Sequence, residues 1–167
     1  MQNTAINEIE LDAVDLRILA QLQSDASLSN QDLALAVNTS APTCLRRIKR
    51  LRDAGLIERQ IAILNPEAVA RALGHGLHAI VEITLDRQGA EALASFEARA
   101  TKDTAVQQCY RVSPGPDFVL VVHAANMPAY LALTQRLFTN DANVRNVKTF
   151  FSVKRAKFGA ELPLLPD

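Results

Sequence analysis

The feature that most constrains the fold of this chain is a change of hydrophobic period near residue 77. Before that point apolar side chains recur mainly at helical spacing, whereas the segment 78–86 (HAIVEITLD) alternates apolar and polar side chains. Alternation of this kind puts every second side chain, from Ala79 to Leu85, on one face of a strand. The change predicts two domains, the first helical and the second built on a sheet.

The second half contains segments in an order that defines a fold class. The patterns predict a helix over 88–100, strands over 105–112 and 117–123, a helix over 126–138 and a strand over 144–158. With the first strand this gives β-α-β-β-α-β, the ferredoxin-like arrangement, and an α+β fold for the chain. Two helices would cover one sheet face. The other face would expose apolar side chains, so we expect it to be buried against a second copy.

The first half has the pattern of three short helices. The first begins at Leu11, and Ser29-Asn-Gln-Asp32 resembles a capping box that opens a second, alanine-rich helix. Asn38 tolerates the left-handed backbone of a sharp turn, after which Ser40 caps a third helix that ends at Gly55. This is the layout of a helix-turn-helix. The loose alternation of 56–64 favours a strand, which would form a wing beside the third helix.

The third helix concentrates positive charge. Five of the last seven residues of the stretch 40–52 are basic and none is acidic, although the whole chain has 18 basic and 18 acidic side chains. This balance excludes a generally basic coat protein, so a polyanion must be met by a local patch. A solvated basic face is the simpler interpretation. Within a helix-turn-helix the pattern favours DNA recognition, with arginines at guanine edges and Lys49, Ser40 and Thr43 at phosphates.

Other functional classes have little support. Cys44 and Cys109 lie outside any CxxC or Cys/His cluster and are expected to be small buried residues in a reducing compartment. His75, His78 and His123 lack metal-ligand spacing, and nucleotide-binding and nucleophile motifs are absent from the sequence. We therefore expect no enzyme activity, no cofactor and no metal. Without a secretion signal or a bilayer-spanning run, the sequence predicts a cytoplasmic protein with no membrane partner.

One loop of the second half has the composition of a ligand site. The glycine and backbone N–H groups of Ser113-Pro-Gly-Pro-Asp117 could hold a small carboxylate, and Asp117 an ammonium group. A plain hairpin turn explains the same residues equally well.

Several segments together resemble the Lrp/AsnC family of bacterial and archaeal transcription regulators, from about Leu11 to Phe158. They are Leu11-Asp-x-x-Asp15-x-x-Ile-Leu19, Pro42-Thr-Cys-Leu-x-Arg47, Ala54-Gly-Leu-Ile57, Asn65-Pro66, Val81-Glu-Ile-Thr84 and Val112-Ser…Asp117-Phe118. The resemblance implies a winged helix-turn-helix over 1–64, a linker over 65–77 and a ferredoxin-like domain over 78–167. It also implies that the latter domain dimerises, assembles dimers into tetramers or octamers, and binds an amino acid or related metabolite.

The candidate site residues follow from these interpretations. Contact with double-stranded DNA is assigned to Ser29, Asn30, Ser40, Ala41, Pro42, Thr43, Arg46, Arg47, Lys49, Arg50 and Arg59. Effector binding is assigned to Ser113, Pro114, Gly115, Asp117 and Phe118. In the family this loop commonly has glycine and an aromatic residue where this chain has Pro114 and Pro116, neither of which offers an N–H to a carboxylate.

Two alternatives remain open at this stage. Siroheme decarboxylases resemble the same two-domain layout and use histidine and arginine on tetrapyrrole carboxylates, roles for which Arg111 and His123 are available. An enzyme has no reason to keep an arginine cluster on the third helix, with only Asp53 near it at helical spacing. An architectural DNA-binding protein would keep the cluster but would show no preferred sequence.

Overall fold

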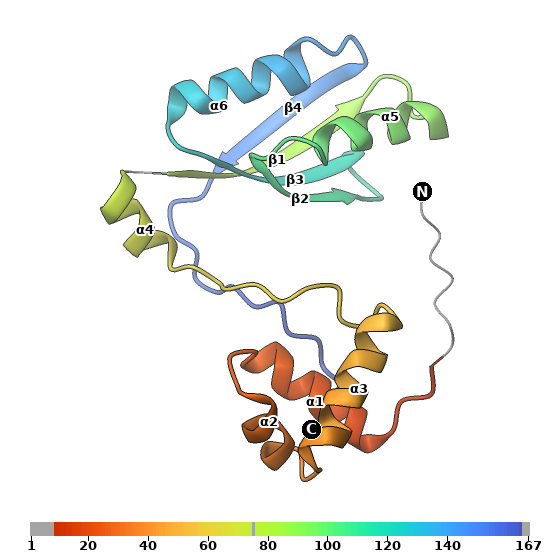
Figure 1. Cartoon of the computed structure of the whole chain (residues 1–167). Coiled ribbons are helices and arrows are strands. Elements are labelled where there is room, and N and C mark those ends of the chain that lie inside the picture. The colour runs from red at the N-terminus through yellow and green to blue at the C-terminus, as the bar shows by residue number, and fades with distance from the viewer. Residues whose placement is uncertain (1–8, 75, 165–167) are drawn as a thin grey trace. The chain divides into compact units, whose positions relative to one another are not determined.

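The computed structural model describes residues 9–74 and 76–164 and divides into two compact units. One unit comprises Met1–Ile63 with Lys157–Asp167, and the other comprises Leu64–Ala156 (Figure 1). The expected α+β fold class is confirmed: the first unit contains helices, and the second contains a sheet with helices. The division differs from the expected boundaries in two respects: the tail from Lys157 joins the N-terminal unit, and residues 64–77 belong to the sheet unit. His75 lies outside the described residues.

The N-terminal unit contains the three expected helices, α1 (Ala13–Ser24), α2 (Asn30–Ala36) and α3 (Ala41–Asp53). Helix α1 starts with a capping box, in which the carboxylate of Asp12 accepts from the N–H groups of Val14 and Asp15. The Asp15 carboxylate accepts in return from the N–H of Asp12. The buried apolar core of the unit consists of Ile18, Leu33, Ala34, Val37, Cys44 and Leu51.

The turn between α2 and α3 is fixed by its backbone conformation and one side chain. Asn38 has φ 55°, the left-handed conformation expected for it. The side-chain amide of Asn30 donates to the carbonyl of Ala41 at 2.8 Å, which joins the first turn of α2 to the first turn of α3. The two helices of the motif are therefore held in a fixed relationship.

The wing prediction for residues 56–64 is wrong as far as a strand is concerned. The segment has no regular structure, and Ile61, Ile63 and Leu64 are exposed. A single alternating segment forms a hairpin only if a second strand pairs with it, and no described segment does so. Leu45, expected on the apolar side of α3, is also exposed.

The second unit begins with the short linker helix α4 (Pro66–Leu73), which ends at Gly74. Its sheet contains β1 (Leu77–Leu85), β2 (Val106–Arg111), β3 (Phe118–Ala124) and β4 (Val144–Phe151) in the order β2-β3-β1-β4, with all neighbours antiparallel. Helix α5 (Ala90–Ala100) and helix α6 (Met127–Thr134), which continues into the π-helical segment η1 (Gln135–Thr139), cover one sheet face (Figure 1). This is the ferredoxin-like arrangement.

The two faces of the sheet differ as the alternation predicts. Ala79, Val81, Ile83 and Leu85 are all buried beneath the helices with Phe96 and Phe118. On the opposite face Ile80, Tyr110 and Phe150 are about half exposed, at 46%, 52% and 45%. An apolar surface of this kind on a sheet is typical of a protein interface.

The last strand is shorter than predicted. β4 ends at Phe151, which pairs with Ala79 of β1, rather than at residue 158. One further backbone hydrogen bond follows, from the N–H of Ser152 to the carbonyl of His78 at 2.8 Å. The chain beyond it belongs to the N-terminal unit from Lys157 onward. There the side chain of Gln23 on α1 donates to the carbonyl of Leu162 at 2.7 Å and accepts from its N–H at 2.9 Å.

Candidate nucleic-acid interface

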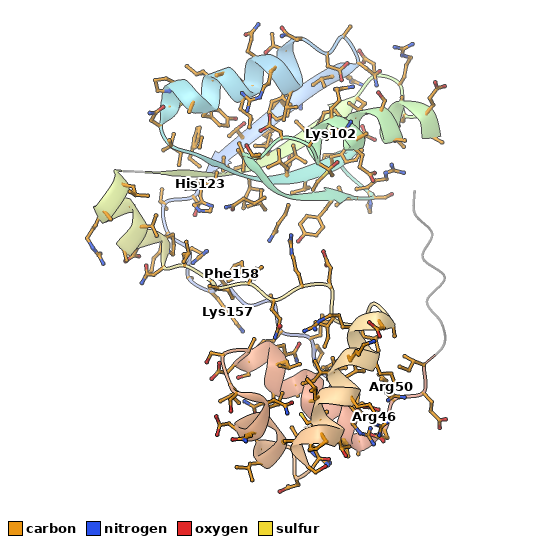
Figure 2. The ribbon with its side chains drawn as sticks, in the orientation of Figure 1. Arg46, Arg50, Lys102, His123, Lys157 and Phe158 are labelled. Carbon is orange, nitrogen blue, oxygen red and sulfur yellow. The ribbon has the colours of Figure 1, made fainter. Side chains whose placement is uncertain are left out.

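Arg46 and Lys49 are exposed cations of α3. No ion pair joins Arg46 to another described residue, and Lys49 bonds only to Asp53 on the same helix, at 2.7 Å. Arg50 lies one helical turn after Arg46, and Figure 2 shows both on α3. The two guanidinium groups therefore share one side of the helix, as a contact with one groove of DNA requires.

Two of the predicted DNA contacts have a second role that sequence spacing did not reveal. Nη1 of Arg47 bonds to Asp12 at 2.7 Å and to Asp15 at 2.8 Å, and Nη2 of Arg50 bonds to Asp15 at 2.5 Å. The expectation that the cluster is free of acids is therefore wrong for these two arginines. The acids come from α1 and the residue before it, outside the helical spacing of α3.

Exposure separates the two paired arginines. The side chain of Arg47 is only 19% exposed, and its Nε is buried without a hydrogen-bond partner among the described residues. Arg50 is 42% exposed and keeps part of its guanidinium group in solvent. Arg47 therefore serves mainly to hold α3 against α1, whereas Arg50 combines that role with an accessible charge.

An open cleft of about 370 Å³ lies beside these arginines. Its lining consists of Glu10, Leu11, Asp12, Arg46, Arg47 and Arg50. The capping N–H of Asp15 and the guanidinium of Arg47 lower the pKa of Asp12 to about 2. Glu10 and Asp12, which precede α1, therefore place negative charge beside the arginines of α3.

The start of α3 presents small polar groups. Ser40 stands at the N-cap, but its hydroxyl donates to the hydroxyl of Thr43 at 2.9 Å instead of capping a backbone N–H. Ala41 and Pro42 form the first turn. Helix starts leave N–H groups without intrahelical partners, which favour the binding of a phosphate oxygen.

The remaining predicted contacts have different surroundings. Ser29 caps α2, and its hydroxyl donates to Asp32 at 2.6 Å. Asn30 is engaged with Ala41, and its Oδ1 is buried without a partner among the residues described. Arg59 is 73% exposed and lies 4.0 Å from Glu58. Arg59 is accessible, although the segment that carries it is not a strand.

The loop proposed for an effector joins β2 to β3. Ser113, Pro114 and Gly115 are exposed, the Ser113–Pro114 peptide is cis, and Gly115 has φ 121°. Asp117 is engaged: its carboxylate accepts from the N–H of Leu85 at 2.7 Å. Asp117 therefore ties the loop to the end of β1.

Phe118 differs from the other predicted effector residues. Its side chain is completely buried and stacks on Phe96, with ring centroids 4.8 Å apart. It supports the loop from within the core and offers no surface to a ligand.

The two cysteines pack in or against the cores of their units. Cys44 is buried and Cys109 half-buried, and burial raises the pKa of both thiols. The described residues hold no cluster of three or more metal-ligating side chains. Within 9–74 and 76–164, no helix has the length and apolarity of a membrane span.

Both units match known protein families. A winged helix-turn-helix DNA-binding model matches residues 11–58, and the Lrp/AsnC ligand binding domain matches residues 78–162. The leucine-responsive regulatory protein of Rhizobium meliloti is 35% identical over 156 residues, covering 93% of this chain and 97% of that protein. The DNA-binding transcriptional activator DecR of Escherichia coli is 32% identical over 154 residues, covering 92% and 99%.

Solved structures give the same result. An AsnC family regulator from Agrobacterium tumefaciens has a TM-score of 0.81 at 31% identity, over 92% of this chain and 97% of that one. A transcriptional regulator from Neisseria meningitidis in complex with L-Met has a TM-score of 0.81 at 31% identity, over 93% and 97%.

A helix-turn-helix with a basic second helix, joined to a ligand-binding sheet domain, defines a DNA-binding transcription regulator. The chain belongs to the Lrp/AsnC family of these regulators. The curated relatives named above are regulators and not enzymes, so the comparisons favour the regulator over the decarboxylase alternative.

Proposed function

We propose that α3 enters the major groove of double-stranded DNA and that Arg46 and Arg50 contact base edges there. The observation that carries the proposal is the exposed guanidinium of Arg46, which forms no ion pair within residues 9–74 and 76–164 and lies one turn from the partly exposed Arg50. Arginine forms bidentate hydrogen bonds with guanine. Lys49, Ser40, Thr43 and the N–H groups of Ala41 are assigned to phosphates, and Arg59 to the flanking backbone.

The ion pairs with α1 indicate that some residues position α3 whereas others contact DNA. Arg47 and Asp15 fix the rotation of α3 about its own axis, because the buried carboxylate accepts from two positions on that helix. With α3 held in this rotation, the side chain of Arg46 lies exposed on the surface of the helix. Ser29 and Asn30 act at the start of α2, where Asn30 positions α3 and Ser29 lies exposed for a phosphate.

The test compares Arg46→Ala with Lys102→Ala, each of which removes one exposed positive charge, from α3 and from the sheet unit respectively (Figure 2). The DNA is a duplex recovered by the wild-type protein from a random pool. We expect Arg46→Ala to weaken binding about fivefold or more, since a bidentate arginine–guanine contact contributes about 1–3 kcal/mol. Lys102→Ala should bind as the wild type does.

Equal affinities of the two variants would contradict the role of α3. A pool that yields no preferred sequence would favour the architectural alternative instead. Arg50→Ala is less informative alone, because it also removes a hydrogen bond from buried Asp15.

We also propose that the sheet unit binds an amino acid at the loop Ser113–Asp117. The Neisseria relative is described as a complex with L-Met, which supports this ligand class. The exposed N–H of Gly115 and the hydroxyl of Ser113 are available to a carboxylate, while Pro114 and Pro116 reduce the number of donors. Methionine is therefore the first ligand to titrate.

Self-association completes the proposal. The exposed face bearing Ile80, Tyr110 and Phe150 supports pairing with a second copy. A dimer presents two α3 helices to half-sites about one turn of DNA apart, and larger assemblies extend this arrangement to several sites. Because its proposed target is DNA, we place the protein in the cytoplasm. Sedimentation of the full chain as a monomer at micromolar concentration would contradict the assembly.

A further inference from the structure

Two histidine rings lie next to each other at one end of the exposed sheet face. His78 of β1 is the direct cross-strand partner of His123 of β3. Their ring centroids are 4.7 Å apart and their planes are inclined at 60°. Among the residues described, neither imidazole makes a hydrogen bond or an ion pair, so no other described side chain occupies the ring nitrogens.

The backbone makes room for this arrangement. A Cβ built on Gly76 would lie 2.4 Å from Cε1 and 2.8 Å from Nε2 of His123, closer than any side chain tolerates. The ring of His123, labelled in Figure 2, therefore rests against a backbone that only glycine provides. His123 is exposed on its other side and His78 is half-buried.

We propose that His78 and His123 together bind one divalent transition-metal ion of the imidazole-preferring class, such as Ni²⁺, Cu²⁺ or Zn²⁺. Neutral imidazole is a common ligand for these ions. An ion about 2 Å from a ring nitrogen lies about 3 Å from the ring centre, so two centroids 4.7 Å apart are within reach of a single ion.

Two ligands from one chain make a half-site. The described residues contain no third histidine, cysteine or carboxylate grouped with the pair. Water, or groups of a second copy docked on this sheet face, would complete the coordination. Arg155 acts electrostatically on His78, and its positive charge opposes a bound cation. His78 lies near the start of β1, whereas the loop Ser113–Asp117 is tied to the end of β1 through Leu85. The inference uses no residue of the proposed DNA or effector site, so it does not depend on the proposed function.

The test uses the full chain, stripped with EDTA and titrated with Ni²⁺, Cu²⁺ and Zn²⁺ by calorimetry. We expect His78→Gln and His123→Gln each to weaken binding at least about tenfold, since even indirect partners of metal ligands contribute that much. Glu82→Gln, which removes an oxygen donor from the same face, should change affinity less than about twofold. Arg155→Ala should tighten binding.

A spectroscopic readout separates direct ligation from an indirect effect. The electron paramagnetic resonance spectrum of bound Cu²⁺ should show coupling to nitrogen from two imidazoles in the wild type and from fewer in either variant. Circular dichroism confirms that the variants fold. The proposal is overturned if the wild type retains no ion at micromolar concentration, if both histidine variants bind normally, or if binding is lost only in His75→Gln.

Discussion

The carboxylate of Asp15, which has no exposed side-chain surface, accepts a hydrogen bond of 2.8 Å from Nη1 of Arg47. A second bond, of 2.5 Å, comes from Nη2 of Arg50. Asp15 also closes the capping box of α1. One buried charge therefore links the start of the first helix to the basic face of the third, and it fixes the side of α3 that remains exposed.

Replacing Asp15 by asparagine should destabilise the N-terminal unit. The change leaves Arg50 without its counter-charge and leaves Arg47 with Asp12 alone, but it alters the size of the side chain little. We expect a loss of about 2 kcal/mol, below the range for fully buried pairs because both arginines retain some solvent. Urea unfolding measures this loss of unfolding free energy. The control is Asp53→Asn, which removes the acid of the exposed Lys49–Asp53 pair. Equal losses in both variants would show that Asp15 has no special role.

Asp12 should make stability depend on acid pH. Its pKa is lowered from 3.8 to about 2 by the N–H of Asp15 and by Arg47. Because the folded chain favours the ionised form, the contribution is complete above the unfolded pKa and is lost as pH falls toward the folded one. Thermal unfolding of wild type and Asp12→Asn should therefore differ at pH 5 and converge near pH 2. A difference at pH 2 as large as the difference at pH 5 would contradict the assignment.

The tail should detach when Gln23 loses its amide. The Gln23 side chain both donates to and accepts from the backbone of Leu162, so Gln23→Ala removes both bonds at once. We expect faster tryptic cleavage after Lys157 and faster exchange of the Leu162 amide hydrogen. Gln21→Ala, on the same helix, is the matched control and should leave both rates unchanged. Similar rates in both variants would mean that the glutamine does not hold the tail.

Asp117 allows the structural and ligand roles of the loop to be separated. Asp117→Ala removes the acceptor for the Leu85 N–H and should cost about 1–2 kcal/mol in unfolding free energy. Asp117→Asn keeps an oxygen acceptor and should be more stable than the alanine variant. If the carboxylate binds the ammonium group of an amino acid, the asparagine variant should nevertheless lose methionine affinity. Undiminished affinity by calorimetry would remove Asp117 from the ligand site.

The fold was predictable because its main signals are local. Period-two alternation placed Ala79 and Leu85 in the core, and both are at most 2% exposed. Asn38 was recognised in the turn because few residues tolerate a positive φ. The same reasoning was misleading for 56–64, where alternation without a pairing strand produced no regular structure. Periodicity identifies a face, but pairing depends on a partner elsewhere in the chain.

The candidate site was less predictable because its ion pairs are not local. Arg47 and Asp15 are separated by 32 positions, far beyond the three or four over which helical spacing operates. A signal was nevertheless present: Asp12 and Asp15 have the spacing of a capping box, which required both acids near the helix start. Phe118 was placed at the ligand through its position in a motif, although its place in the alternation of β3 makes it a core residue.

The claim that α3 lies in the DNA groove can be tested with a tethered cleavage reagent. Arg46→Cys and Lys102→Cys variants, with Cys109 replaced by serine and Cys44 protected by burial, are labelled with an iron chelate and bound to the selected duplex. We predict strand cuts centred within the recognised sequence from position 46 and none from position 102. Cuts from position 102 without cuts from position 46 would contradict the account.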